Sequence, residues 1–454
     1  MTQHSPIAAI ILAAGKGSRM KSDLHKVLHP IAARPMLLHL IDAVQTLSPD
    51  RIVVVTGAGR DQVEKAVAPL GIGTALQAEQ LGTGHAVLQA RDSLAGFDGD
   101  VLILYGDVPL ISATTMQRMI DRLHAPDAPA TVVLGFRPAD PAAYGRIIAD
   151  ADGRIGKMVE YKDASPDERA VTLCNSGLMA ARAADLFALL ARVGNDNAAG
   201  EYYLPDVVML AASDGRPSAV IETDADEVAG VNSRAELAGV ERRWQQRRRA
   251  QAMADGATLI APDTVWFAHD TRIGRDVVIE PHVVFGPDVS VADGVTIHAF
   301  CHIEGTTIAN GATVGPYARL RPGTVLGEGA KIGNFVETKQ AVLGPGAKAN
   351  HLSYLGDATI GANANIGAGT ITCNYDGFFK YQTIIGAGAF IGSNSALVAP
   401  VSIGAGAIVA AGSVVTRDVS ADALALVRPD QTEKPGWAAS FRAAMTARKA
   451  RKQP

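Results

Sequence analysis

Residues 273–297 read IGRDVVIEPHVVFGPDVSVADGVTI, a stretch in which an apolar side chain recurs at every sixth position. The period continues to residue 415, with a one-residue slip after Ile303 and a disturbed middle. The positions that carry it are Ile273, Ile279, Phe285, Val291, Ile297, Ile303, Ile308, Val314, Leu320, Leu326, Ile332, Ile385, Ile391, Leu397, Ile403, Val409 and Val415. A helix repeats at about 3.6 residues and a strand at about 2, whereas a solenoid of short stacked strands fits this spacing. We therefore expect a parallel β-helix of hexapeptide repeats in the C-terminal half.

Length and composition limit the remaining possibilities. At 454 residues the chain exceeds a single hydrophobic core and suggests two or three domains. A formal net charge of −4 favours neither a nucleic-acid nor a membrane partner. Three widely separated cysteines (Cys174, Cys301 and Cys373) give neither a disulfide framework nor a zinc pattern. The sequence also shows no secretory leader and no long apolar run, so we expect a cytoplasmic protein.

The N-terminal half, residues 1–233, alternates short apolar runs with amphipathic stretches. Expected strands are Ile7–Leu12, Ile52–Thr56, Val101–Leu104, Thr131–Phe136 and Ala219–Glu222. Expected helices include Met36–Leu47, Gln62–Ala68 and Thr115–Leu123. This alternation predicts a mostly parallel, doubly wound α/β domain of the Rossmann-like kind.

A charged segment separates the two halves. Residues 234–254 are rich in arginine and in good helix formers, so we expect an exposed linker helix. Its run Arg247-Arg248-Arg249 could also bind nucleic acid, but a charge run on a helix is more often a solvated face. The β-helix domain then covers residues 255–454 and ends in a Lys/Arg-rich tail of uncertain order.

The first expected strand runs into a glycine-rich turn, Leu12-Ala13-Ala14-Gly15-Lys16-Gly17-Ser18-Arg19-Met20. Glycines after a strand let backbone N–H groups approach phosphate oxygens. Arg19 and Lys26 would add the positive charge that binds a triphosphate and stabilises departing pyrophosphate. By itself such a turn could be an ordinary tight turn, and its spacing matches neither a Walker A loop nor a dinucleotide fingerprint.

The complete string resembles the signature of sugar-1-phosphate nucleotidyltransferases, Leu-Ala-Ala-Gly-x-Gly-Thr-Arg-Met followed by a lysine, with Ser18 in place of threonine. The resemblance implies that Asp107 and Asn232 hold Mg²⁺, which prefers hard oxygen ligands. It also implies catalytic roles for Arg19 and Lys26. The implied contacts to UTP and the sugar nucleotide are Leu12, Ala13, Ala14, Gly15, Lys26, Gln77, Gly82, Thr83, Tyr105, Gly106, Asp107, Gly145, Glu160, Asn175 and Asn232.

Polar side chains gather where the six-residue period is disturbed. Arg321 and Lys339 could hold a sugar phosphate, and His351 could take a proton from an amine that attacks a thioester. Lys380 lies in a segment that interrupts the period, and such interruptions in solenoids form loops, often on a binding face. A β-helix can also serve only to assemble an oligomer. The presence of these titratable side chains favours a catalytic β-helix over a purely structural one.

Across both halves the chain resembles the bifunctional N-acetylglucosamine-1-phosphate uridylyltransferase / glucosamine-1-phosphate acetyltransferase family. The resemblance implies a left-handed β-helix, a homotrimer, a product that feeds cell-wall synthesis, and His351 as the general base of acetyl transfer. The implied contacts to glucosamine 1-phosphate are Arg321, Lys339, Tyr354, Asn365 and Lys380. The implied contacts to acetyl-CoA are Ala368, Asn374, Tyr375, Ser393, Ala411 and Arg428.

Three alternatives stay open at this point. The protein could be a monofunctional sugar-1-phosphate nucleotidyltransferase whose β-helix only assembles the oligomer. It could be a non-catalytic trimeric scaffold, which the charged groups at both sites disfavour. The β-helix could bind zinc through His282, His298 and His302, but zinc needs three ligands converging from adjacent coils, and we read these histidines as surface residues.

Overall fold

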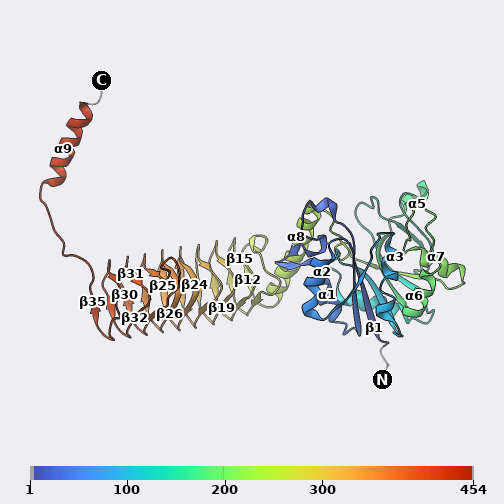
Figure 1. Ribbon diagram of the computed structural model, residues 1–454, viewed down its shortest axis with the longest axis horizontal. Coiled ribbons are helices and arrows are strands. Elements are labelled where there is room, and N and C mark those ends of the chain that lie inside the picture. Colours follow the sequence, from blue (N-terminus) through green and yellow to red (C-terminus); the bar gives the residue numbers. More distant parts are fainter. Residues whose placement is uncertain (1–4, 198, 452–454) are drawn as a thin grey trace. The chain divides into compact units, whose positions relative to one another are not determined.

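The computed structural model describes residues 5–197 and 199–451. The chain divides into two compact units (Figure 1). The first contains the chain up to Gln251 together with Phe267–His269, and the second contains Ala252–Trp266 and the chain from Asp270 onward. No helix in the described part of the chain is both long and apolar enough to cross a membrane.

A mostly parallel sheet forms the centre of the first unit. Its strands are, in spatial order, β11 (Ala219–Thr223), β7 (Thr131–Phe136), β10 (Cys174–Arg182), β6 (Asp100–Tyr105), β1 (Ile7–Ala13), β4 (Arg51–Thr56) and β5 (Gly73–Leu76). Only β10 on this path runs antiparallel to its neighbours β6 and β7, among the residues described. A side hairpin of β8 (Arg146–Ala149) and β9 (Ile155–Val159) joins β10. The predicted doubly wound fold and its five strands are confirmed.

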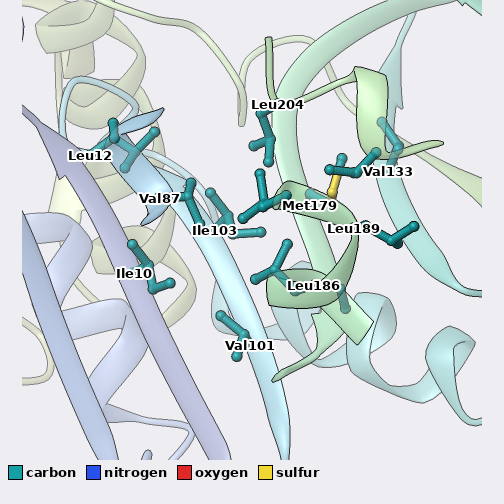
Figure 2. Packing of buried hydrophobic residues seen from close by; sticks show 14 of the residues in the cluster. Ile10, Leu12, Val87, Val101, Ile103, Val133, Met179, Leu186, Leu189 and Leu204 are labelled. Carbon is teal, nitrogen blue, oxygen red and sulfur yellow. The ribbon is translucent and has the colours of Figure 1, made fainter. Parts of the chain in front are cut away.

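Alternating residues of β1 explain why both faces of the sheet are covered. Ile7, Ala9 and Ile11 pack into a core that contains α1 (Met36–Gln45), α2 (Arg60–Val67) and α4 (Ala113–Leu123). Ala8, Ile10 and Leu12 pack into the opposite core with α3 (Thr83–Leu88), α6 (Ala183–Leu190) and α7 (Asp206–Ser213). Figure 2 shows this second core, where Ile10 and Leu12 of β1 lie beside Val87 and Ile103. Since side chains in the middle of the strands are used for packing, we expect ligand sites at the carboxyl ends of the strands, among their last residues and the loops that follow.

The arginine-rich segment forms α8 (Arg234–Ala254), as predicted, but it is not simply exposed. Gln245, Arg249 and Ala252 are buried along one face, and Val240 is buried on another side of the helix, in a cluster with Met20 and Ile31. The Gln245 side chain exchanges two hydrogen bonds with the Phe267 backbone, at 2.7 and 2.9 Å. The expectation of a solvated helix is therefore wrong for this face, because residues spaced three or four apart pack while the charged residues occupy the remainder.

The second unit is a parallel β-helix, which confirms the prediction from the six-residue period (Figure 1). One of its sheets contains β12 (Thr258–Leu259), β14 (Val278–Ile279), β17 (Thr296–Ile297), β20 (Thr313–Val314), β23 (Lys331–Asn334), β25 (Lys348–His351), β27 (Asn365–Ile366), β30 (Phe390–Ile391), β33 (Ile408–Val409) and β35 (Leu424–Ala425). Along the others run β13 (Arg272–Ile273), β15 (Val284–Phe285), β16 (Val289–Val291), β18 (His302–Ile303), β19 (Thr306–Ile308), β21 (Arg319–Leu320), β22 (Thr324–Leu326), β24 (Glu337–Leu343), β26 (Tyr354–Ile360), β28 (Ile371–Cys373), β29 (Thr383–Ile385), β31 (Ala396–Val398), β32 (Val401–Ile403) and β34 (Val414–Val415).

Strand pairing shows how the period builds coils. Ile279 pairs with Ile297 and Ile297 with Val314, so one coil takes 18 or 17 residues, or three hexads. Ile366 pairs with Ile391, a separation of 25 residues, and the extra residues form the loop that contains Lys380. The basic tail, whose order the sequence left uncertain, contains helix α9 (Trp437–Ala450).

Candidate active sites

The first site lies where β1 and β6 end. The two strands are parallel neighbours that pair Leu12 with Tyr105, and the Gly106 N–H donates to the Leu12 carbonyl at 2.9 Å. A pocket of about 360 Å³ opens beyond them, in the size range of small-molecule sites. It is lined by the predicted residues Leu12, Ala13, Ala14, Gly15, Lys26, Gln77, Gly82, Thr83, Tyr105, Asp107 and Asn232. Residues predicted from separate motifs are thus brought together in one cavity.

The glycine-rich turn brings Lys26 against the end of β1. Gly17 has φ +60°, and a Cβ at this position would lie only 2.7 Å from the Lys26 Cβ, so a larger residue could not occupy it without displacing the lysine backbone. Arg19 lies on the short 3₁₀ turn η1 (Ser18–Met20), exposed and outside the residues that line the pocket. In this structure Lys26 therefore lines the pocket, whereas Arg19 lies outside it.

Asp107 and Asn232 meet at a single cationic group. Lys26 Nζ lies 2.5 Å from Asp107 Oδ2 and 3.1 Å from Asn232 Oδ1, and the two charged side chains are largely shielded from solvent. The Val231 N–H donates to the Asp107 carbonyl at 3.0 Å, which fixes the loop of Asn232 beside the end of β6. One carboxylate and one amide oxygen, with room for phosphate and water, form a donor set that suits Mg²⁺.

Gln77 and Thr83, two of the residues implied to contact UTP or the sugar nucleotide, also border this pocket. Gln77 is buried, and its Nε2 donates to the Gly82 carbonyl at 3.1 Å. Gly82 has φ +109°, and a Cβ there would lie 2.6 Å from the Tyr202 carbonyl oxygen. Thr83 Oγ1 accepts a hydrogen bond from the Leu204 N–H at 3.0 Å. The segment of Gly82 and Thr83 thus lies against the segment of Tyr202 and Leu204, and this close approach closes one side of the pocket.

Gly145, Glu160 and Asn175 line a neighbouring small pocket together with Tyr203 and Asp206. The Asn175 N–H donates to the Gly145 carbonyl at 2.9 Å. Burial raises the pKa of Glu160, and the charges of Asp163 and Asp206 raise it further. Gly145, Glu160 and Asn175, which the resemblance implies as contacts to the sugar nucleotide, are therefore adjacent to one another, but they line a different pocket from Lys26 and Asp107.

Four residues line the larger pocket without having been assigned to it from the sequence: Val27, Gln80, Ala86 and Glu201. Three of them are near neighbours of assigned residues within the same motifs. Glu201 comes from a distant segment that reaches the pocket through the hydrogen bond from the Tyr202 N–H to the Leu81 carbonyl at 2.8 Å. No local pattern in the sequence signals that approach.

The second site surrounds His351 on the β-helix. His351 is exposed at the end of β25, and its Nδ1 lies 2.7 Å from Asn334 Oδ1 on the preceding coil. Since the amide oxygen can only accept, Nδ1 is the donor, and in the neutral ring Nε2 therefore carries the lone pair. Asn334 was not assigned from the sequence, although its separation of one coil from His351 is a usable signal.

Three of the predicted cations lie close to one another on the β-helix. Arg321 Nη1 bonds Glu337 Oε1 at 2.9 Å. The neighbouring ammonium of Lys380, through hydrogen-bonding contact and charge, lowers the pKa of Lys339, and Arg321 adds to the effect. Cations held this close together form a favourable site for a phosphate dianion. The structure thus brings Arg321, Lys339 and Lys380 together as predicted.

Tyr354 and Asn374 approach each other over Gly356. A Cβ on Gly356 would lie 2.5 Å from the Tyr354 hydroxyl and 2.6 Å from Asn374 Nδ2. Asn374 Nδ2 also donates to Asp357 Oδ2 at 2.5 Å, which ties the inserted loop to the coil below it. Tyr375 in this loop is exposed, and Asn365 lies on β27, the strand that pairs with β25.

The remaining predicted residues form a row that continues from His351. The carbonyls of His351, Ala368 and Ser393 each accept a hydrogen bond from a corner amide of the following coil, at 3.3, 2.7 and 2.8 Å. Ala411 occupies the next step, and Arg428 bonds its carbonyl. With a coil spacing of about 4.8 Å the row measures roughly 14 Å, which suits an extended ligand with its reacting end at His351.

Two of the three histidines considered as zinc ligands have other contacts. His298 Nδ1 lies 2.9 Å from Glu280 Oε1, and His282 stacks on Phe300 with ring centroids 4.8 Å apart. Within residues 5–197 and 199–451, no group of three or more His, Cys, Asp or Glu side chains is arranged to hold a metal ion.

Comparisons with known proteins match both halves of the chain. The family described as MobA-like NTP transferase domain matches residues 9–155, and the family described as Bacterial transferase hexapeptide (six repeats) matches residues 270–305 and 305–340. The Bifunctional protein GlmU of Sphingopyxis alaskensis is 68% identical over 453 residues, covering 99% of each chain. The protein of the same name from Rhizorhabdus wittichii is 69% identical over 445 residues, covering 98% of each, and that of Zymomonas mobilis is 60% identical over 444 residues, covering 97% of this chain and 99% of the relative.

Proposed function

The chain belongs to the family of bifunctional GlmU proteins, and from that membership and the two sites we propose that it makes UDP-N-acetylglucosamine in two consecutive steps. Residues 255–454 transfer the acetyl group of acetyl-CoA to glucosamine 1-phosphate. Residues 1–233 then join N-acetylglucosamine 1-phosphate to UTP and release pyrophosphate. Residues 234–254 connect the two domains. The family match confirms the resemblance found in the sequence and does not favour a monofunctional enzyme.

The observation that carries the acetyl-transfer step is the geometry of His351. Its Nε2 is left as a proton acceptor by the bond between Nδ1 and Asn334. The same β-helix carries the cluster of Arg321, Lys339 and Lys380, which suits a sugar phosphate. The substrate amine attacks the acetyl carbonyl, Nε2 takes the amine proton, and the C–S bond breaks as the CoA thiolate leaves. The proton returns to the thiolate, so no covalent enzyme intermediate is required.

The uridylyl-transfer step rests on the convergence of Lys26, Asp107 and Asn232. A phosphate oxygen of the sugar phosphate attacks the α-phosphorus of UTP, and the bond to the β-phosphate oxygen breaks. The attacking oxygen is already anionic, so the residues bind and align the phosphates rather than remove a proton. Mg²⁺ bound to Asp107 and Asn232 would supply positive charge against the charge that develops on the transferred phosphates. Lys26 contributes a second positive charge at the same place.

We further propose that the protein is a homotrimer. His282, Phe300, Tyr317 and Phe335 stack along one corner of the β-helix, with ring centroids 4.8, 4.8 and 5.2 Å apart. Phe300 and Tyr317 are each 48% exposed and Phe335 is 54% exposed. A continuous exposed apolar row of this kind is unusual on a monomer and favours coverage by another copy.

A cytoplasmic location fits this chemistry. Cys174, Cys301 and Cys373 are free thiols, as expected in a reducing compartment where UTP and acetyl-CoA are available. Expression with a fluorescent tag, followed by fractionation, tests the location directly.

Assays of the two half-reactions in two variants test the proposal. Asp107→Ala should lose pyrophosphate release from UTP and keep acetyl transfer, whereas His351→Ala should do the reverse. A wild-type protein that releases pyrophosphate but never consumes acetyl-CoA would instead show that the β-helix serves assembly only. If either variant loses both activities while staying folded, the two-site assignment is wrong.

A further inference from the structure

Lys26 belongs to a loop that is held by a side chain from another helix. Gln62, on α2, accepts a hydrogen bond from the His25 N–H through Oε1 at 2.8 Å. The other end of the same amide, Nε2, donates to the Asp23 carbonyl at 2.9 Å. A single glutamine thus bonds the backbone on both sides of Leu24, immediately before the lysine.

His25 holds the other side of this loop. Its imidazole is buried, with 7% of the residue exposed, although histidine has two polar ring nitrogens. Nδ1 accepts from the Val27 N–H at 3.4 Å and caps the 3₁₀ turn η2 (Lys26–Leu28). Gly59, just before α2, leaves room for the ring, because a Cβ there would lie 3.3 Å from His25 Cδ2.

Burial, together with neighbouring positive charges, favours the neutral form of His25 that this cap requires. Burial lowers its pKa, and the neighbouring charges of Lys26 and His29 lower it further. A neutral ring can accept the Val27 N–H, whereas a protonated ring could not. The hydrogen bonds from Gln62 of α2 and the cap of η2 by His25 therefore fix the same stretch of backbone, residues 23–27.

That segment determines where the Lys26 ammonium lies. Lys26 is the first residue of η2, and its Nζ reaches Asp107 and Asn232 at the far side of the pocket. A long flexible side chain delivers its charge to a fixed point only if its backbone is fixed. We propose that Gln62 and His25 are positioning residues for uridylyl transfer, which hold the loop so that Lys26 meets the phosphates of the nucleotide. This inference rests on the proposed function of the first unit.

The central test is Gln62→Leu, which removes both hydrogen bonds and keeps the side-chain size. We expect kcat for uridylyl transfer to fall roughly tenfold, in line with the cost of misplacing a catalytic group. Acetyl transfer by the same preparation should not change, which serves as the folding control. A matched control is Gln117→Leu, since the Gln117 amide bonds Asp121 within its own helix at 2.8 Å.

Two further variants separate positioning from a general loss of stability. In a Lys26→Ala background, Gln62→Leu should cause no additional loss, because a residue that acts through Lys26 has nothing left to position. His25→Leu, which removes the Nδ1 cap of the Val27 N–H and keeps an apolar side chain in the buried position, should likewise lower the rate of uridylyl transfer and leave acetyl transfer unchanged.

The outcomes distinguish this inference from the function on which it rests. An inactive wild-type protein in the uridylyl assay would refute the proposed function itself. With an active wild type, the inference fails if Gln62→Leu keeps full activity, or if its effect persists in the Lys26→Ala background. It also fails if acetyl transfer falls in parallel with uridylyl transfer.

Discussion

Replacing Asn334 by leucine should slow acetyl transfer and leave uridylyl transfer unchanged. Asn334 Oδ1 lies 2.7 Å from His351 Nδ1, and this bond keeps the proton on Nδ1 and the lone pair on Nε2. Leucine is similar in size but offers no acceptor. The His351 ring would then lose both its fixed tautomer and its fixed orientation, while the coil beneath it stays intact.

The size of the effect follows from these two losses. A hydrogen bond of this kind contributes about 1 kcal/mol, and the regained freedom of the ring costs about 1 kcal/mol more. A total of about 2 kcal/mol in transition-state stabilisation corresponds to a roughly 30-fold lower kcat. Removing the base altogether by His351→Ala should cost about 10²–10⁴, so the Asn334 variant should fall between that and wild type.

The assay is release of the CoA thiol at saturating substrates, with pyrophosphate release measured on the same preparation. Asn334→Asp is the matched control, because it keeps an acceptor for Nδ1–H and should retain most of the rate. Its carboxylate favours the imidazolium form, so the acid limb of its pH–rate profile should move to higher pH. The reasoning is refuted if Asn334→Leu keeps more than half of the wild-type rate, or if both variants lose equally.

Three other changes test separate parts of the structure. Burial, followed by the charges of Asp163 and Asp206, raises the folded-state pKa of Glu160, so ionised Glu160 costs stability as the pH rises above its ordinary value of 4.5. Glu160→Gln should therefore raise the Tm of the first unit at neutral pH and give no gain below pH 4.5. The substitution should also weaken sugar binding. Calorimetry over this pH range that shows no such trend in Tm would contradict the reasoning. Lys339→Ala should raise the KM for glucosamine 1-phosphate roughly tenfold through loss of a phosphate contact, while the KM for acetyl-CoA stays constant. If the KM for acetyl-CoA rises instead, Lys339 contacts acetyl-CoA rather than the sugar phosphate. Tyr317→Asp should dissociate the oligomer in sedimentation experiments, because it places a charge within the aromatic stack, and an intact trimer would show that this corner is not the interface.

The sequence predicted the fold well because both halves repeat a simple rule of burial. In the first unit, alternate residues of strands such as β1 enter two different cores, so the strand is apolar throughout and easy to find. In the second unit, two positions of each hexad are buried, as Val295 and Ile297 are, and the aliphatic residue of the period stacks on its equivalent in the next coil. Each rule needs only neighbouring residues in the chain, and both are visible without the structure.

Contacts between distant segments could not be predicted in this way. Glu201 reaches the pocket only because the backbone around Tyr202 bonds the segment of Leu81. The buried face of α8 depends on a partner, the Phe267 backbone, that lies beyond the end of the helix. Neither contact can be recognised from the surrounding sequence. Glu201 lies outside the assigned motifs, and the composition of α8 is that of a solvent-exposed helix.

The β-helix offers a further rule that connects its period with its chemistry. Residues one coil apart lie beside each other at about 4.8 Å, so a separation of 17 or 18 residues measures proximity across coils. Asn334 and His351 are paired in register at this separation, as are Glu337 and Tyr354. Arg321 and Lys339 have the same separation in the sequence, and their charges interact. Polar residues at one-coil spacing in a hexapeptide-repeat sequence therefore identify the contacting groups of a site, whereas the apolar positions of the period identify only the scaffold.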